Sequence, residues 1–162
     1  MTVKEFKFQY ALGTISKEDL IDIAQKSSSK YILTALSKEK YWSVRSSVAK
    51  NPRTPIKVIA ELSKDIDWAV KSYVAENPST PVEVLAALSK DEDWYVRCGV
   101  GKNPNTPVEI LTKLSDDKDY HVRIKIAKHP NTPKKILIKL SKDKDGDVKY
   151  WVIANLRRLK KR

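Results

Sequence analysis

The sequence predicts an all-α fold, a solenoid built from two-helix repeats of 26 residues. Three features recur at this spacing: a Leu-Ser pair, a basic residue nine positions after the leucine, and the dipeptides Asn-Pro (once His-Pro) and Thr-Pro. The leucines of the Leu-Ser pairs are Leu36, Leu62, Leu88, Leu114 and Leu140. A fixed period of this length is typical of repeat architectures, in which each unit buries its apolar face against its neighbours.

The first helix of each repeat is predicted to follow an aspartate. In the second repeat Asp67 is a good N-cap residue, and Val70, Val74 and Ala75 then share one helical face. Asn77 is expected to end this helix, because asparagine tolerates the left-handed conformation of a helix C-terminus and the proline that follows cannot continue the helix.

The second helix is predicted to start at the Thr-Pro dipeptide. Thr80 is expected to cap it, with Pro81 in the first helical position, and Glu83 completes a capping box. Leu85 and Leu88 then form the buried face. Neither helix has much more than about ten residues, and helices this short are not stable in isolation. The stacking of neighbouring repeats must therefore supply the burial.

A single solenoid domain is predicted to extend over residues 1–162. At its start, Thr2 and Glu5 form a possible capping box and Gly13 can end the first helix. Beyond Leu140 the prolines disappear, which predicts one longer final helix that caps the stack. The predicted parts are an N-terminal cap with a degenerate repeat at 1–35, full repeats at 36–61, 62–87, 88–113 and 114–139, and a C-terminal capping half-repeat at 140–162.

The repeat resembles that of a known family. The pattern Val-Arg-x-x-Val-Ala-x-Asn-Pro-x-Thr-Pro, followed by a leucine-rich helix and Leu-Ser-Lys-Asp-x-Asp-Trp, is similar to the leucine-rich repeat variant family, and it stands at 44–55, 70–81, 96–107 and 122–133. The resemblance implies a right-handed, HEAT-like superhelix of paired helices, the second of them α or 3₁₀. It implies no general catalytic activity. The iron–sulfur domain of some members is not expected, because this chain lacks the clustered cysteines.

The composition favours an acidic partner and a location in the cytoplasm. A net charge of +12 favours nucleic acid, an anionic membrane surface or an acidic protein face. The sequence has no run of about 18 apolar residues, so we expect no transmembrane segment. Residues 1–10 lack the apolar middle of a signal peptide. The single cysteine, Cys98, cannot form an internal disulfide or assemble a metal site by itself, so we expect a small structural residue.

One candidate binding feature is the basic residue of each repeat. We call Arg45, Lys71, Arg97, Arg123 and Lys149 the basic row, since identical positions line up along a solenoid. A structural role is the alternative, because an aspartate lies four residues before four of the five, and such pairs stabilise a helix by about 0.2–0.5 kcal/mol each. The same side chains could also reach an aspartate of a neighbouring repeat. Tyr41 replaces the aspartate before Arg45, which makes Arg45 the member predicted to be most available to a partner.

A second candidate is an aromatic residue three positions before the first four members of the basic row. We call Trp42, Trp68, Trp94 and Tyr120 the aromatic row. Residues three apart share a helical face, so the two rows together could stack on bases or hold a peptide. The alternative is that the rings cover the seam between repeats with their polar groups toward water. Gly146 breaks the row, so this surface would stop before the C-terminus.

Positive charge is concentrated in residues 36–61 and in the last third of the chain. A groove that follows phosphates along its whole length would need basic residues in the middle repeats as well. The C-terminal Arg157, Arg158, Lys160, Lys161 and Arg162 could bind nucleic acid or an acidic partner, or could be a solvated end that prevents solenoids from stacking end to end.

Catalytic, metal and cofactor sites are not expected. His121 and His129 are eight residues apart, and His129 takes the place of the repeat's asparagine. Gly99 and Gly101 lack the third glycine and the preceding strand of a dinucleotide-binding loop. The sequence therefore predicts a non-enzymatic module, without a small-molecule substrate, that binds an acidic or extended protein through the two rows. The alternative is a nucleic-acid-binding protein with basic patches in the first full repeat and the C-terminal third.

Overall fold

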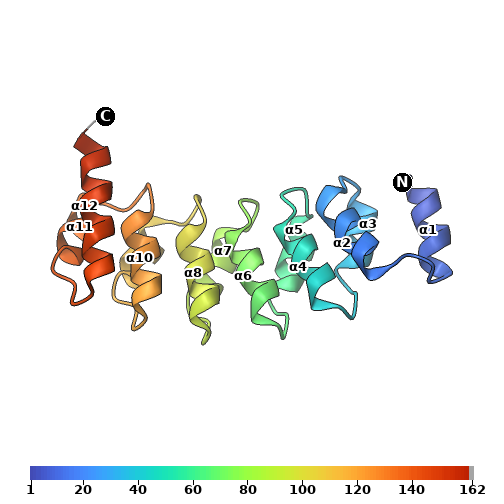
Figure 1. Ribbon diagram of the computed structural model, residues 1–162, viewed down its shortest axis with the longest axis horizontal. Helices are drawn as coiled ribbons and strands as arrows, with labels where there is room; N and C mark the ends of the chain where they lie inside the picture. Colours follow the sequence, from blue (N-terminus) through green and yellow to red (C-terminus); the bar gives the residue numbers. More distant parts are fainter. Residues whose placement is uncertain (161–162) are drawn as a thin grey trace. The chain divides into compact units, whose positions relative to one another are not determined.

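In the computed structural model, residues 1–160 are described, with side chains as far as residue 158, and all regular structure in this range is helical. The chain forms two compact units, residues 1–81 and 82–162 (Figure 1). The first contains α1 (Val3–Ala11), α2 (Lys17–Lys26), α3 (Lys30–Leu36), α4 (Trp42–Lys50), α5 (Ile56–Leu62) and α6 (Trp68–Glu76). The second contains α7 (Val82–Leu88), α8 (Trp94–Lys102), α9 (Val108–Leu114), α10 (Tyr120–Lys128), α11 (Lys134–Leu140) and α12 (Gly146–Lys160). The all-α class is confirmed, and a single continuous domain stays a prediction.

Long and short helices alternate, and within each unit the long helices stack on one another. Helices α2, α4 and α6 form this stack in the first unit, and α8, α10 and α12 form it in the second (Figure 1). The short helices have seven residues and pack against the neighbouring long helices of their unit. They are α-helical, which decides between the two forms that the sequence left open.

The core of each unit lies between its long and short helices, and a small residue lets the long helices approach closely. Val48 of α4 and Ile59 of α5 are fully buried. A Cβ atom added to Gly101 of α8 would lie 2.9 Å from the Cβ atom of Lys125 on α10, too close for an ordinary contact. The corresponding residues of α4, α6 and α10 are fully buried alanines: Ala49, Ala75 and Ala127. Close stacking of the long helices therefore depends on a small side chain here.

Aspartates cap the long helices, as predicted. Each carboxylate accepts a hydrogen bond from the backbone N–H two residues further on, as Asp67 does from Ala69 at 2.9 Å. Asp93, Asp119 and Asp145 make the same contact. Tyr41 precedes α4 in place of an aspartate and gives no side-chain cap. The first full repeat therefore lacks a contribution of about 1 kcal/mol that the others have.

The Thr-Pro dipeptide has a different role from the predicted one. The hydroxyl of Thr106 donates back to the carbonyl oxygen of Val100 in the preceding long helix, at 2.6 Å. Pro107 is the N-cap residue of α9, and no side chain caps this helix. The threonine thus ends one helix and does not cap the next. The serines of the Leu-Ser pairs end the short helices, and Ser63 Oγ donates to the carbonyl oxygen of Ala60 at 2.9 Å.

Asparagine ends α4, α6 and α8, and its backbone there is extended and not, as predicted, left-handed. Asn51 has an extended backbone, with φ −70° and ψ 121°. Its Nδ2 donates to the carbonyl oxygens of Ala24 and Ser27 in the preceding repeat, at 2.8 Å each. Its Oδ1 accepts from the backbone N–H of Arg53 at 2.9 Å. One buried side chain therefore ties two repeats together.

The same bridge recurs in the second unit with two variations. Asn155 Nδ2 donates to the carbonyl oxygen of Ala127 at 2.7 Å, although α12 continues past it. His129 replaces asparagine: its Nε2 lies 2.9 Å from the carbonyl oxygen of Asn103, and its Nδ1 accepts from the backbone N–H of Asn131 at 3.2 Å. Burial lowers the pKa of His129, which favours the neutral ring that this pair of contacts requires.

Both ends agree with the sequence prediction. Thr2 and Glu5 form a capping box at the start of α1. Gly13 follows the end of α1 with φ 65°, a conformation that glycine adopts without strain. At the other end α12 has 15 residues, because no proline stops it where the earlier repeats turn.

Replacing Asn51 by alanine is expected to lower the free energy of unfolding by about 2–3 kcal/mol, because buried carbonyl groups of the preceding repeat lose their donor. Urea denaturation followed by circular dichroism measures this. The matched control is Asn131→Ala, since Asn131 is exposed and its side chain donates to the carbonyl oxygen of Pro104 at the surface. The control should change stability by less than about 0.5 kcal/mol. Equal effects of the two substitutions would contradict the bridging role of Asn51.

Candidate functional site

The arginines of the basic row join consecutive repeats. Arg45 pairs with Asp65 through two bonds, with Nε 2.6 Å from Oδ2 and Nη2 2.9 Å from Oδ1. Its Nη1 donates to the carbonyl oxygen of Glu39 at 2.8 Å. The same pairing recurs in the second unit at Arg97–Asp117 and Arg123–Asp143. Each arginine thus connects the loop before its own helix to an aspartate of the next repeat.

These contacts confirm the alternative that basic side chains reach an aspartate of a neighbouring repeat, and they correct two other predictions. Arg97 and Arg123 do not pair with the aspartates four residues upstream, because those aspartates cap the helices. Arg45 is not available to a partner, since its guanidinium is engaged by Asp65 and by loop carbonyl groups. Arg97 and Arg123 are only 5% and 6% exposed. Of the lysines in the row, Lys149 is exposed and Lys71 is half-buried.

The aromatic row lies at the surface but does not share a binding face with these arginines, which turn into the loops. Trp42 is 51% exposed, Trp68 46% and Tyr120 39%. Trp94 is half-buried, and its ring stacks on Tyr95 and His121, with ring centroids 3.7 Å and 4.5 Å away. In the second unit the Trp94 ring therefore covers the seam between neighbouring repeats, as the structural alternative predicted for the row, whereas Tyr120 is exposed.

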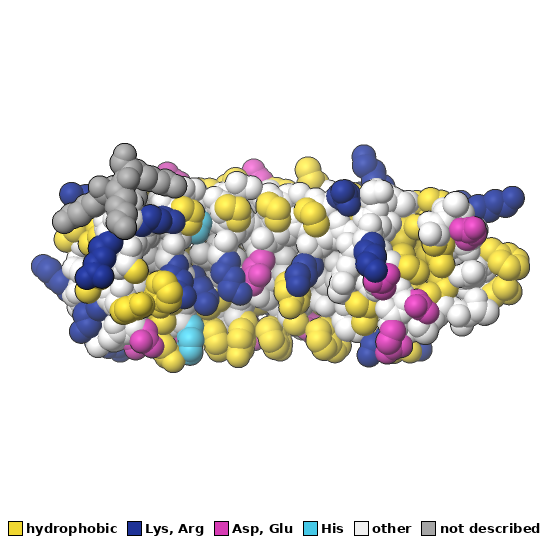
Figure 2. Space-filling model, turned by 45° about the horizontal axis from the view of Figure 1, so that its top comes forward, with side chains coloured by type: hydrophobic (Ala, Val, Ile, Leu, Met, Phe, Trp, Pro, Cys, Tyr) yellow, Lys and Arg dark blue, Asp and Glu magenta, His cyan; other side chains and the backbone are white. Residues whose placement is uncertain are grey.

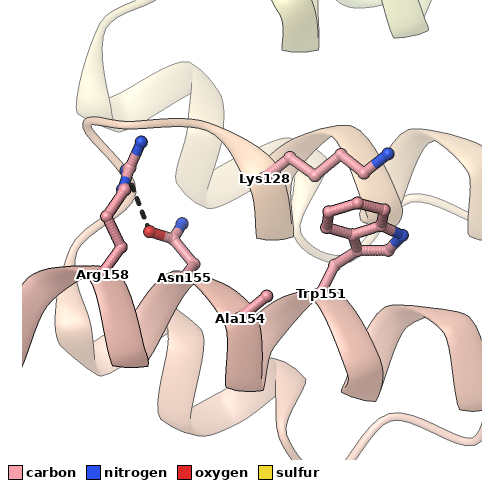
Figure 3. Close-up of a pocket in the computed structure, with 5 residues that line it drawn as sticks. All are labelled: Lys128, Trp151, Ala154, Asn155 and Arg158. Carbon is pink, nitrogen blue, oxygen red and sulfur yellow. Dashed lines mark hydrogen bonds between the residues drawn. The ribbon is translucent and has the colours of Figure 1, made fainter.

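A different set of basic side chains lines the long helices of the second unit. A pocket of about 230 Å³ lies between α8 and α10, and Lys102, Lys125 and Lys128 contribute to its walls. An adjoining pocket of about 290 Å³ lies between α10 and α12, and it is lined by Lys128, Trp151, Ala154, Asn155 and Arg158 (Figure 3). We call Lys102, Lys125, Lys128 and Arg158 the basic surface. Basic side chains gather over these C-terminal helices in Figure 2.

Neighbouring side chains hold two of these cations in place. Lys128 Nζ lies 3.5 Å from the ring centroid of Trp151, and Arg158 Nη2 donates to Asn155 Oδ1 at 2.9 Å (Figure 3). Burial and the nearby charge of Lys125 lower the pKa of Lys128. Within residues 1–158, no carboxylate forms an ion pair with Lys125, Lys128 or Arg158. A bound anion would supply the countercharge that this part of the protein does not.

Sequence reasoning singled out Arg158 but missed Lys102, Lys125 and Lys128 of the basic surface, although one signal for them is present. Lys50, Lys102 and Lys128 occupy the same position of their repeats, eight residues after a member of the aromatic row. Trp151 lies outside the aromatic row and was not singled out. Of the C-terminal basic residues, Arg157 and Arg158 are exposed on α12, whereas the side chains of Lys160, Lys161 and Arg162 lie outside the described part.

The described residues offer little for catalysis. Among them, no group of three or more His, Cys, Asp or Glu side chains could hold a metal ion. Cys98 is buried, and burial raises the pKa of its thiol to about 11, so the thiol is protonated near neutral pH. None of the helices in residues 1–160 combines the length and the hydropathy needed to cross a bilayer.

Comparisons with known proteins support the repeat and the fold. The family model "Leucine rich repeat variant" matches residues 68–93. Among solved structures, the chain is similar to "a leucine-rich repeat variant with a novel repetitive protein structural motif", at 23% identity and a TM-score of 0.49, over 92% of this chain and 70% of that one. It is also similar to an engineered protein, at 19% identity and a TM-score of 0.52, over 99% and 98% of the two chains. No curated protein gives a match.

The alternating helices define a helical repeat protein, a class that presents extended surfaces of stacked elements to interaction partners. The match at 68–93 covers one period of 26 residues, and its pattern recurs before and after it in the chain. The repeat of this protein is thus similar to that of the leucine-rich repeat variant family.

Replacing Asp143 by asparagine is expected to lower the free energy of unfolding at pH 7 by about 3–5 kcal/mol, because Arg123 loses its buried countercharge. The hydrogen bond from Arg123 holds the pKa of Asp143 below its ordinary value. The ion pair therefore stabilises the fold above about pH 4, where an unfolded aspartate ionises, and this contribution is lost as the pH falls through the lower pKa of the folded state.

Urea denaturation at several pH values tests this, with Asp147→Asn as the control, since Asp147 is an exposed aspartate of the same repeat. The difference in the free energy of unfolding between wild type and D143N should become smaller in acid, while D147N should stay close to wild type at every pH. A difference that keeps its full size in acid would show that the ion pair is not its source.

Proposed function

We propose that this chain is a non-enzymatic interaction module that binds an acidic, extended segment of a protein partner on the basic surface of its second unit. The observation that carries the proposal is the placement of Lys125, Lys128 and Arg158 at two adjoining pockets, without an ion pair to any described residue. Helical repeat proteins bind along stacked helices, and this surface crosses three of them, α8, α10 and α12.

An acidic protein segment fits the basic surface better than a nucleic acid does. Single strands bind to aromatic rings on which bases stack, but the ring of Trp151 already has the ammonium of Lys128 over it. A groove that follows phosphates needs basic residues in successive repeats. The position of Lys102 and Lys128 is occupied by Glu76 in the second full repeat, which interrupts the series of lysines. Nucleic-acid binding through separate basic patches is the alternative outcome of the test below.

The exposed members of the aromatic row offer contacts of a second type. Trp42, Trp68 and Tyr120 present large, partly polar rings to solvent, and such residues often dominate the binding energy of protein interfaces. We propose that they add apolar contacts to a partner of the same class. Lys149, exposed on α12, is a further candidate contact, whereas Arg45, Arg97 and Arg123 are assigned to the fold.

The double substitution Lys125→Gln with Lys128→Gln is expected to weaken binding of a glutamate-rich peptide about tenfold or more, because two charge-assisted contacts are lost. Fluorescence anisotropy of the labelled peptide at low salt measures the affinity. The control is Lys134→Gln with Lys135→Gln, which removes the same charge from exposed positions on α11. If both variants weaken binding equally, the peptide senses net charge and not the basic surface.

The same assay with random single-stranded and duplex DNA separates the two partner classes. The proposal expects the peptide to bind more tightly than DNA of matched charge. Tighter binding of DNA, with the steep log-linear salt dependence of phosphate contacts, would support the alternative instead. A wild-type protein that binds no acidic peptide at low salt would overturn the proposed function.

A further inference from the structure

We infer that the pocket between α10 and α12 takes an apolar side chain of the acidic segment, flanked on both sides by carboxylates. This inference rests on the proposed function and names what that surface selects. Four of the five lining residues, Trp151, Ala154, Asn155 and Arg158, come from α12 with the spacing i, i+3, i+4 and i+7. They therefore lie along one face of the helix, over about 10 Å from the first to the last.

The charges lie at the two ends of the pocket. Lys128 approaches from α10 and places its ammonium over the Trp151 ring, while the guanidinium of Arg158 lies at the other end beside Asn155 (Figure 3). The two cations do not converge on one point, so the pocket is not built for a single phosphate group. Each is held by a neutral neighbour, an indole ring in one case and an amide oxygen in the other, and both keep their charge for a ligand.

The floor between these charges is apolar. It is centred on the Ala154 methyl group and is bordered by the indole of Trp151, one face of which carries the Lys128 ammonium; both residues are half-buried (Figure 3). Side chains of an extended peptide alternate between its two faces, and the chain advances about 3.3 Å per residue, so residues i, i+2 and i+4 face the same way over about 13 Å. Two acidic residues four positions apart would place a carboxylate near each cation, since their flexible side chains can reach inward. The residue midway between them would then project its side chain onto the floor.

The first unit contains a corresponding pair of a lysine and an aromatic residue, and the comparison shows how the floor of the pocket differs between the units. Lys50 of α4 lies over the ring of Tyr73 on α6, with Nζ 5.5 Å from the ring centroid. These residues correspond by repeat position to Lys128 and Trp151. Glu76 occupies the position of Ala154, so the first unit has a carboxylate where the second has a methyl group. The floor of the α10–α12 pocket is thus free of the negative charge that would repel an acidic segment.

The test compares two labelled peptides of equal charge in an anisotropy titration, one with Glu-Gly-Leu-Gly-Glu and one with Glu-Gly-Gly-Gly-Glu at its centre. The leucine peptide is expected to bind wild type about five- to tenfold more tightly, since it buries an additional aliphatic side chain. In Ala154→Leu the new side chain fills the floor, so the leucine peptide should fall to the affinity of the glycine peptide, which should not change. Ala87→Leu is the control, an alanine exposed on α7.

The outcomes separate this inference from the proposed function. Equal, measurable binding of both peptides to wild type would overturn the apolar pocket and leave the acidic partner in place. Binding of neither peptide would overturn both. The wild-type comparison decides the inference even if a variant fails to fold, and a loss of leucine preference in Ala87→Leu as well as in Ala154→Leu would also count against it.

Discussion

The fold depends on side chains that bond from one repeat to the next. Its helices are too short to be stable alone, so every repeat needs a neighbour. Apolar burial draws repeats together but has no direction. Direction comes from buried polar groups: Asn51 donates to carbonyl groups of the preceding repeat, and Arg45 reaches forward to Asp65 in the following one. A change in the spacing of the repeats would leave these polar groups buried without hydrogen-bond partners, which would lower the free energy of unfolding.

These bridges also determine which residues remain for a partner. The arginines of the basic row are engaged in contacts within the fold. Only side chains that take no part in these bridges are available to a partner. On the long helices, one such position carries Tyr73, Lys125 and Trp151 in different repeats, and another carries Glu76, Lys128 and Ala154. Substitution at these positions changes the surface and leaves the core intact. The repeat thereby separates the requirements of stability from those of binding.

The parts of the fold that follow local rules could be predicted from the sequence. The repeat period is visible in the sequence itself, and the aspartate caps and the long final helix depend on residues a few positions apart. The threonines of the Thr-Pro dipeptides and the asparagines were misassigned because such rules look for partners within one helix, whereas Thr106 donates to the preceding helix and the partners of Asn51 lie in another repeat. The lysines of the proposed binding surface were missed for a related reason. Arg123 and Lys125 are two residues apart on α10, and only the packing of the neighbouring helices decides that one is buried and the other faces a pocket.

The central claim is that the arginines of the basic row serve the fold while the α8, α10 and α12 face binds the partner. An NMR titration with a glutamate-rich peptide tests it most directly, by following the Nε–H signals of the arginines and the indole N–H signals of the tryptophans. The account predicts that Trp151 and Arg158 shift on binding while Arg45, Arg97 and Arg123 do not. Shifts confined to those three arginines and to Trp42 and Trp68, with Trp151 unmoved, would contradict it.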